Sequence, residues 1–194
     1  GKIVDPIPNA EKYLDKTSPF YTTDNGTPTD GYEVPWDPGV DVIVTNMAVT
    51  PNTEKAPTTA DEFKKWIMDN PGKITYPTCD DTFGRRSVYM FSALVCGGDW
   101  HNGFNEKTTK AEVKKAMQPA LDWLVEVNPY LWQGGKNYPQ SSDEWMKMFA
   151  NGEVANCFDW SAYGTAAKIA AGTYPDTAHD QFMDFGTLSG MGYL

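Results

Sequence analysis

Three stretches of the sequence place hydroxyl, carboxylate and aromatic side chains directly before an expected helix. In the first, residues 76–87, a short expected strand leads into hydroxyl groups, a glycine and two arginines. Free N–H groups and the helix dipole favour an anion at such a point. The alternative is that Asp81 or Thr82 only caps the helix while the arginines pair with surface acids. The candidate binding residues here are Asp81, Thr82, Gly84, Arg85, Arg86 and Ser87.

The other two stretches have the same form. Residues 157–164 pass from an expected strand into a helix and supply Asp159, Trp160, Ser161 and Tyr163, which could equally be a helix cap with core aromatics. Residues 136–142 precede a capped helix, where Tyr138 could stack on a ligand and Ser141 could donate a hydrogen bond or merely cap. Because open α/β sheets bind ligands beyond the carboxyl ends of their strands, the first two turns are expected to face one crevice.

Catalytic chemistry has weaker support. The sequence lacks the G-x-G-x-x-G, G-x-x-x-x-G-K-[ST] and G-x-S-x-G loops of dinucleotide, nucleotide and hydrolase sites. Both histidines, His101 and His179, fall in expected loops without an evident nucleophile. Paired carboxylates could serve a glycosidase, but Asp143 and Glu144 are explained by the first turn of a helix. We therefore expect no catalytic residues.

The cysteines Cys79, Cys96 and Cys157 are too few for a disulfide scaffold. A metal site would have to recruit His101 with Cys79 and neighbouring aspartates, without the paired spacing that zinc sites show. The sequence therefore predicts neither a metal nor a cofactor, and it leaves open whether Cys79 and Cys96 are bridged.

Composition narrows the remaining classes. The chain has 194 residues, with 16 Lys and Arg against 26 Asp and Glu, and a formal net charge of −10. Binding to phosphate backbones requires basic contacts, so nucleic acid is not expected as a partner. Apolar stretches such as 88–96 fall far short of the roughly 20 residues that span a bilayer. The chain starts at Gly1 without the basic and apolar regions of an export signal, which is expected to have been removed or to lie outside it.

The elements that must position these residues alternate between strands and helices. Turn-forming residues crowd the first forty positions and disfavour long elements there. Thr59 with Glu62 is a capping box, and Pro119 should kink or split its helix. The expected strands are Val40–Val44, Lys73–Tyr76, Val154–Phe158 and Gln181–Thr187. The first expected helix begins at Thr58 or Thr59 and ends at 70–72. Four more helices are expected at Thr82–Val95, Lys110–Val127, Asp143–Asn151 and Ser161–Ala171. This alternation predicts an α/β sheet with helices on its faces.

Taken in order, these segments resemble the extracellular solute-binding proteins of ABC importers, in the family that carries thiamine, iron, polyamines and similar small solutes. Residues 31–36, including Trp36, resemble the family's crossing strand, and residues 57–77 resemble its helix followed by a strand. Thr82-Phe83-Gly84 stands where the family has a Ser/Thr-Gly ligand turn. The resemblance implies a periplasmic-binding-protein-like type II lobe, with a mixed sheet flanked by helices.

The resemblance also implies a domain organisation and a function. Residues 1–34 would be a leader belonging to or packing on the first lobe, and residues 35–194 the second lobe, with hinge-crossing strands near 35–44 and 187–194. The protein would capture a small-molecule solute between lobes and deliver it to membrane permease subunits, without enzymatic activity. It would be periplasmic or extracellular and membrane-tethered.

The solute's charge stays open at this point. Arg85 and Arg86 stand where small residues are more usual in the family and suit an anionic group. Asp159 and the aromatic side chains suit a cation or a heteroaromatic ring. These aromatic side chains are Trp36, Tyr138, Trp160 and Tyr163.

Two other classes compete with this interpretation. One is a carbohydrate-active enzyme or sugar-binding module, suggested by seven tryptophans and surplus carboxylates. A row of exposed tryptophans would favour it, whereas burial of Trp66, Trp123 and Trp145 in helices would not. The other is an interaction domain without a small ligand.

Overall fold

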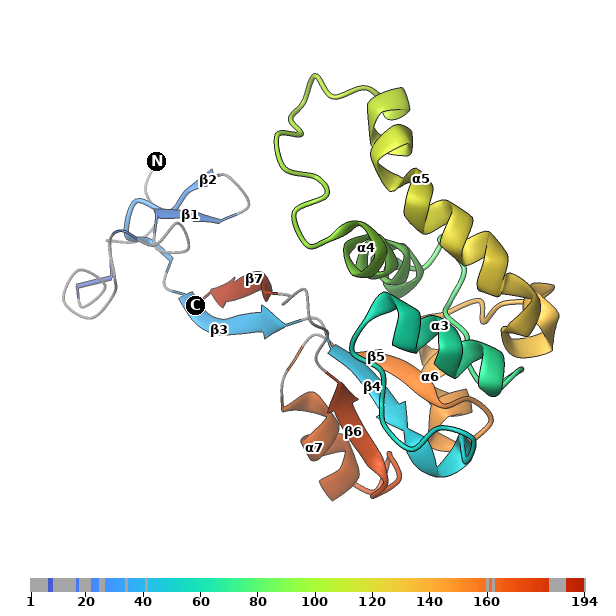
Figure 1. Ribbon diagram of the computed structural model, residues 1–194. Helices are drawn as coiled ribbons and strands as arrows, with labels where there is room; N and C mark the ends of the chain where they lie inside the picture. Colours follow the sequence, from blue (N-terminus) through green and yellow to red (C-terminus); the bar gives the residue numbers. More distant parts are fainter. Residues whose placement is uncertain are drawn as a thin grey trace. The chain divides into compact units, whose positions relative to one another are not determined.

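The computed structural model describes residues 7–8, 17, 22–24, 27–33, 35–40, 42–159, 161, 163–181 and 188–193 (Figure 1). The chain divides into two compact units. Unit 1 comprises Gly1–Val40 with Leu188–Leu194, and unit 2 comprises Asp41–Thr187. All the helices described below belong to unit 2.

Unit 1 contains two short antiparallel ladders. Strand β1 (Thr23–Asp24) pairs with β2 (Thr27–Pro28), and β3 (Pro35–Val40) pairs with β7 (Leu188–Tyr193). The two-residue strands fit the turn-rich sequence, in which regular structure is repeatedly interrupted. The second ladder joins residues from opposite ends of the sequence, since Val40 lies opposite Leu188.

The expected single strand Val40–Val44 is wrong in its boundaries. Val40 ends β3, and a separate strand, β4 (Val42–Asn46), follows it. The two strands have different partners, β3 in unit 1 and β4 in unit 2, so the apolar run belongs to two sheets. An uninterrupted β-branched sequence carries no sign of such a change of partner.

Unit 2 is built on a three-stranded sheet with the order β5-β4-β6. Both β5 (Asn156–Asp159) and β6 (Ala178–Gln181) pair antiparallel with β4. They therefore run in the same direction and are connected through helix α7 (Gly164–Ala170). The α/β class is confirmed. The expected mixed sheet is not seen among the described strands, whose ladders are all antiparallel, because β4 lies between the two strands that share a direction.

The register of the sheet assigns side chains to its two faces. Paired residues of an antiparallel ladder point to the same side. Cys157 and Asp180 both lie opposite Val44, and Asp159 lies opposite Val42, so these polar residues share a face. Phe158, opposite Ile43, points to the other face.

Local sequence signals set most of the helices. Side chains of Thr59 and Thr109 cap α3 and α5, each within a complete capping box. Asp81 caps α4 and Ser141 caps α6. Pro119 does not split α5, which continues through it. The helices are α3 (Ala60–Asp69), α4 (Thr82–Cys96), α5 (Lys110–Val127) and α6 (Ser142–Ala150), with short 3-10 turns at Met47–Val49, Asn128–Tyr130 and Trp132–Gly135.

Two expected elements near the end of the chain differ from the structure. Helix α7 begins at Gly164 and not at Ser161, because the chain first makes a turn in which the Gly164 N–H donates to the Ser161 carbonyl at 3.1 Å. The expected strand Gln181–Thr187 meets β6 only at Gln181, and residues 182–187 lie outside the described residues.

The expected strand Lys73–Tyr76 is extended chain without a regular ladder. Its backbone groups are nevertheless bonded to the outer side of β5. The Lys73 carbonyl accepts from the Ala155 N–H at 2.6 Å, and the Asn156 side chain bonds both the N–H and the carbonyl of Thr75 at 3.0 and 2.7 Å. A buried amide side chain thus replaces part of a backbone ladder, which is why this segment is not a strand.

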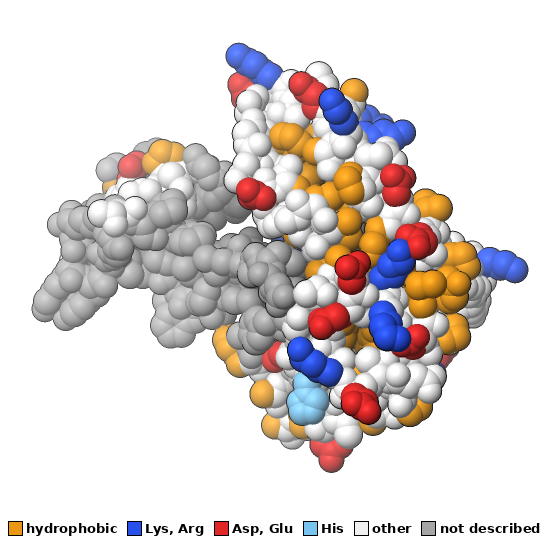
Figure 2. Space-filling model, viewed as in Figure 1, with side chains coloured by type: hydrophobic (Ala, Val, Ile, Leu, Met, Phe, Trp, Pro, Cys, Tyr) orange, Lys and Arg blue, Asp and Glu red, His pale blue; other side chains and the backbone are white. Residues whose placement is uncertain are grey.

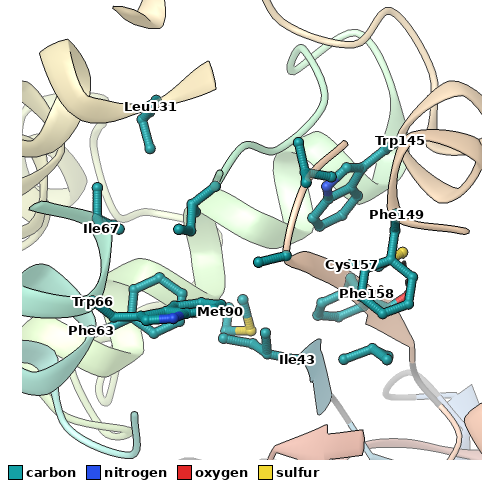
Figure 3. Packing of buried hydrophobic residues seen from close by; sticks show 14 of the residues in the cluster. Ile43, Phe63, Trp66, Ile67, Met90, Leu131, Trp145, Phe149, Cys157 and Phe158 are labelled. Atoms are coloured by element: carbon teal, nitrogen blue, oxygen red, sulfur yellow. Dashed lines mark hydrogen bonds between the residues drawn. The ribbon is translucent and has the colours of Figure 1, made fainter. Parts of the chain in front are cut away.

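The core lies between the sheet and α3, α4, α5 and α6 (Figure 3). Phe63 makes ring contacts with Trp66, Phe91 and Trp123 at centroid distances of 5.3, 5.8 and 6.3 Å. The largest fully buried side chains include Trp66, Trp145, Phe149 and Phe158. This core fixes the starts of the helices against the sheet.

Candidate functional site

The three stretches singled out in the sequence meet at one end of the unit 2 sheet. Residues 73–76 run alongside β5 in the same direction, so the start of α4 and the carboxyl end of β5 lie together. The Phe83 ring packs edge-on against Phe158 at 5.5 Å. We call this region the helix-start edge and define it as residues 76–87, 138–144 and 157–165.

The third stretch is joined to the first by backbone and ring contacts. The Thr78 N–H donates to the Pro139 carbonyl at 2.9 Å, and the rings of Tyr76 and Tyr138 lie 5.1 Å apart. The Tyr138 hydroxyl donates to the Asn128 side-chain oxygen. Half-buried Tyr138 is therefore held from two sides, with part of its surface exposed at the edge.

The Asp81 carboxylate connects two helix starts. One oxygen accepts from the Phe83 N–H at 2.7 Å, which caps α4. The other accepts from the N–H and the hydroxyl of Ser142, at 3.1 and 3.3 Å, in the first turn of α6. Partial burial tends to raise the pKa of Asp81, but the bonds from Ser142 and Phe83 outweigh it and lower the pKa. The carboxylate therefore stays ionised and acts as a bridge within the protein.

Arg85 is exposed and bonded to the loop before α4. Its guanidinium donates to the carbonyls of Cys79 and Asp80 at 2.9 and 3.0 Å and to the Thr82 hydroxyl at 3.1 Å. These acceptors are neutral oxygens, so they brace the loop without offsetting the charge of the guanidinium. Arg86 is half-buried on the next position of the same helix.

Gly84 and Ser87 face inward. A Cβ atom at Gly84 would lie 2.0 Å from the Thr78 carbonyl oxygen and 2.6 Å from that of Pro77, so α4 approaches this backbone as closely as glycine permits. The Ser87 hydroxyl is buried and donates to the Phe83 carbonyl at 2.7 Å within the helix. Both residues shape the edge from inside.

The second stretch centres on a buried ion pair. The Asp159 side chain is 8% exposed and lies 2.5 Å from the Lys168 ammonium of α7. A Cβ atom at Gly164 would meet this carboxylate at 2.5 Å, so glycine lets the start of α7 close over it. The ammonium also lies 5.1 Å from the centre of the Tyr174 ring, whose hydroxyl contacts the Cys157 sulfur at 3.4 Å.

The remaining predicted residues lie in several environments. Tyr163 is 59% exposed, and Ser141 caps α6. Ser161 is half-buried, and its hydroxyl has no hydrogen-bond partner among the described residues. Trp160 lies outside the described residues. Trp36 is part of β3 in unit 1, and only its backbone is described.

Several residues that build the edge were not found from the sequence. Asn156, Ser142 and Lys168 hold the edge together through partners that lie 81, 61 and 9 residues away. Only Lys168 had a local signal, because a lysine late in a helix also suits the helix dipole. A fourth residue, Asp180, lies on the same sheet face as Asp159.

Asp180 is a carboxylate in an unfavourable position. Burial raises its pKa, the Thr165 hydroxyl partly offsets this, and the nearby charge of Asp159 raises the pKa further, whereas Lys168 and His179 lower it. Within the described part of the chain, one buried oxygen of Asp180 and the buried Thr165 hydroxyl form no hydrogen bond of standard geometry. The folded state therefore holds the proton of Asp180 more tightly than the unfolded state.

Because this pKa is raised, the substitution Asp180→Asn is expected to increase thermal stability, and the increase should depend on pH. An acid with a raised folded-state pKa costs stability as pH rises through that pKa, and the cost is absent below the unfolded value. At pH 7 the variant is expected to melt at a higher temperature than the parent chain, and at pH 3.5 the difference should shrink. Melting both proteins at the two pH values checks this. An equal difference at both would contradict the assignment.

The cysteines contribute no disulfide to this arrangement. Cys79 is exposed, Cys96 is half-buried, and burial raises the pKa of the fully buried Cys157 to about 11. Across the described residues, no three His, Cys, Asp or Glu side chains are grouped so that they could hold a metal ion. All three thiols are free, and His101 contacts Tyr89 and Trp100.

The tryptophans do not form an exposed row among the five whose side chains are described. Trp66, Trp123 and Trp145 are buried, and Trp100 and Trp132 are half-buried. This is the distribution expected of core packing, so the described tryptophans give the carbohydrate alternative no support. On the visible face of unit 2, acidic and basic side chains are interspersed (Figure 2). In the described part of the chain no helix is long and apolar enough to cross a membrane.

Comparison with known proteins defines the class. The spermidine/putrescine ABC transporter substrate-binding protein PotD of Streptococcus pneumoniae has a similar fold, with a TM-score of 0.51 over 85% of this chain and 42% of that chain, at 14% identity. This places the chain in the periplasmic-binding-protein class of α/β folds. The chain belongs to the bacterial extracellular solute-binding protein family, whose model matches residues 2–192.

A curated relative is similar over most of this chain. Protein YnjB of Escherichia coli strain K12 is 27% identical over 180 residues, which cover 93% of this chain and 44% of YnjB. The chain thus spans less than half the length of either relative.

Proposed function

We propose that this chain is part of the solute-binding component of an ABC importer. The whole protein captures a small molecule in a cleft between two lobes and delivers it to permease subunits in the membrane. It does so outside the cytoplasm, tethered to the membrane, and without chemistry on the solute. The observation that carries the proposal is that three separated stretches converge on the helix-start edge in a chain of the solute-binding family.

We further propose unit 2 as the second lobe. The strands β3 and β7, together with the passage from residue 40 to 42, are the proposed hinge crossings. Support comes from the division of the chain, whose boundaries fall at 40/41 and 187/188. Residues 1–34 then belong with the first lobe. A hinge needs only a few residues at the ends of elements to absorb the motion.

The geometry divides the predicted site residues by role. Thr82, Tyr138, Ser161 and Tyr163 have surface at the edge and are proposed to contact the solute, and Trp36, Arg86 and Trp160 remain candidates. Asp81, Gly84, Arg85, Ser87, Ser141 and Asp159 are proposed to hold the edge in shape, since their groups are bonded or buried within the protein.

The solute class is proposed from the charges at the edge. Carboxylates already lie at all three helix starts, Asp81 at α4 and α6, and Asp159 at α7. Aromatic surface remains exposed at Tyr163. This combination favours a cationic or neutral solute with a flat or apolar part. PotD, the structural relative, is named for spermidine and putrescine, which are cationic.

Mass spectrometry of the complete protein tests the function. Purified gently from its native source, it should carry a small molecule that is released on denaturation. In calorimetry with that molecule, Tyr163→Ala is expected to weaken binding about tenfold, as loss of an aromatic anchor does. Val125→Ala, at a 74% exposed position on α5, is the control and should bind normally. A complete protein that retains and binds no small molecule would contradict the proposal.

A further inference from the structure

The starts of α4 and α6 share one resident anion. Both helices are long enough to have a substantial dipole, at 15 and 9 residues. The N–H groups of Phe83 and Ser142, in the first turns of the two helices, donate to the two oxygens of the same carboxylate, at 2.7 and 3.1 Å. An anion from solution would need these same donors, and it would also meet the negative charge of Asp81.

The surroundings are otherwise suited to an anion. Arg85 and Arg86 lie in the first turns of α4, and the hydrogen-bond acceptors that the structure gives Arg85 are neutral oxygens. Two helix starts beside the Arg85 guanidinium would make a strongly anion-attracting region. The carboxylate at position 81 is what offsets this attraction at the helix starts themselves.

We infer that Asp81 is a specificity-determining residue. It fills the paired starts of α4 and α6 with the protein's own negative charge and so excludes anionic groups of a solute from them. The inference rests on the proposed function for its biological meaning, but the exclusion itself is a property of unit 2. It assigns to Asp81 a role that a simple helix cap does not have, because a cap serves one helix and need not carry a charge.

The test converts the helix starts into an anion site. Asp81→Ser keeps an N-capping hydroxyl for α4, removes the charge and leaves the Ser142 N–H free. The probe is inorganic phosphate, titrated into the 194-residue chain against sodium chloride of equal ionic strength. Asp80→Asn is the matched control, because it removes the same charge from an exposed neighbour without freeing an N–H donor. Asp81→Asn, which also keeps a cap, replaces the serine variant if that one does not fold.

The expected result is a gain of binding. The Asp81 variant should show a saturable rise in melting temperature, roughly 3–6 °C when phosphate reaches ten times its Kd. The parent chain and Asp80→Asn should show no saturable rise. A saturable rise of equal size in the parent, or none in either Asp81 variant, would overturn the inference. Neither outcome depends on finding the natural solute, so the proposed function stands or falls separately.

Discussion

Gly84→Ala is expected to lower the melting temperature by about 6 °C or more. The added methyl group would lie 2.0 Å from the Thr78 carbonyl oxygen, and the atoms it meets are backbone atoms that no rotamer change can move. Overpacking of this kind costs about 3 kcal/mol when the surroundings cannot yield, and in a chain of this size each kcal/mol lowers Tm by about 2–4 °C. The loss should exceed the small gain in helix propensity that alanine brings.

Gly72→Ala separates this steric effect from backbone strain. Gly72 has a positive φ of 80°, but a Cβ atom there would meet nothing within 4 Å. Its substitution should therefore cost only about 1 kcal/mol, from the conformation itself. Thermal melts of the two variants beside the parent make the comparison. If Gly84→Ala melts no lower than Gly72→Ala, the close approach of α4 to residues 77–78 is not a constraint on the fold.

Lys168→Met is the second substitution with a large expected effect. Methionine keeps much of the side chain's packing but leaves the buried Asp159 carboxylate without its ammonium partner. Removing one member of a buried ion pair leaves the other charge poorly solvated and without that compensating charge. Because the lysine side chain is 31% exposed, we expect a loss of about 2 kcal/mol, less than the roughly 3–5 kcal/mol of fully buried pairs, measured by urea unfolding.

The chain offers a matched control in another lysine–aspartate pair. Lys65 and Asp69 are also 2.5 Å apart, but Lys65 is 74% exposed. Lys65→Met is expected to change stability far less, since exposed pairs contribute little. The double variant Lys168→Met with Asp159→Asn should recover part of the lost stability, because the buried carboxylate charge is then removed together with the ammonium. Equal losses from the two lysine substitutions would show that burial does not decide the strength of the Asp159 pair.

Local patterns predicted most of the helices. The capping box predicted at Thr59 depends on a glutamate three residues later, and α3 begins where this short pattern says. Helix α5 also begins at its expected residue, Lys110. The sheet was less predictable. The apolar run around Val40 is shared between two sheets, and residues 73–76 are bonded partly by the Asn156 side chain, which no local pattern reveals.

The sequence pointed to the segments that form the candidate site but not to the contacts that their side chains make. All three stretches reach the same edge, whereas the sequence led us to expect this only of the first two. What each side chain does there depends on partners far away in sequence. From the sequence alone, Asp81 could equally have been a solute ligand or a helix cap. Only its hydrogen bond from Ser142, 61 residues later, shows that its carboxylate bonds the starts of two helices.

The pairing of β3 with β7 bears on how the chain is made. On a ribosome, β3 emerges long before its partner, because all of unit 2 is translated between them. Unit 2 can therefore complete its core while β3 still lacks a neighbour, and the two-stranded ladder closes after that core has formed. Once unit 2 has folded, the loop that the ladder must close is already compact, so its entropic cost is far below that of a flexible chain of the same length. Synthesis order and topology thus favour folding of unit 2 before β3 pairs with β7.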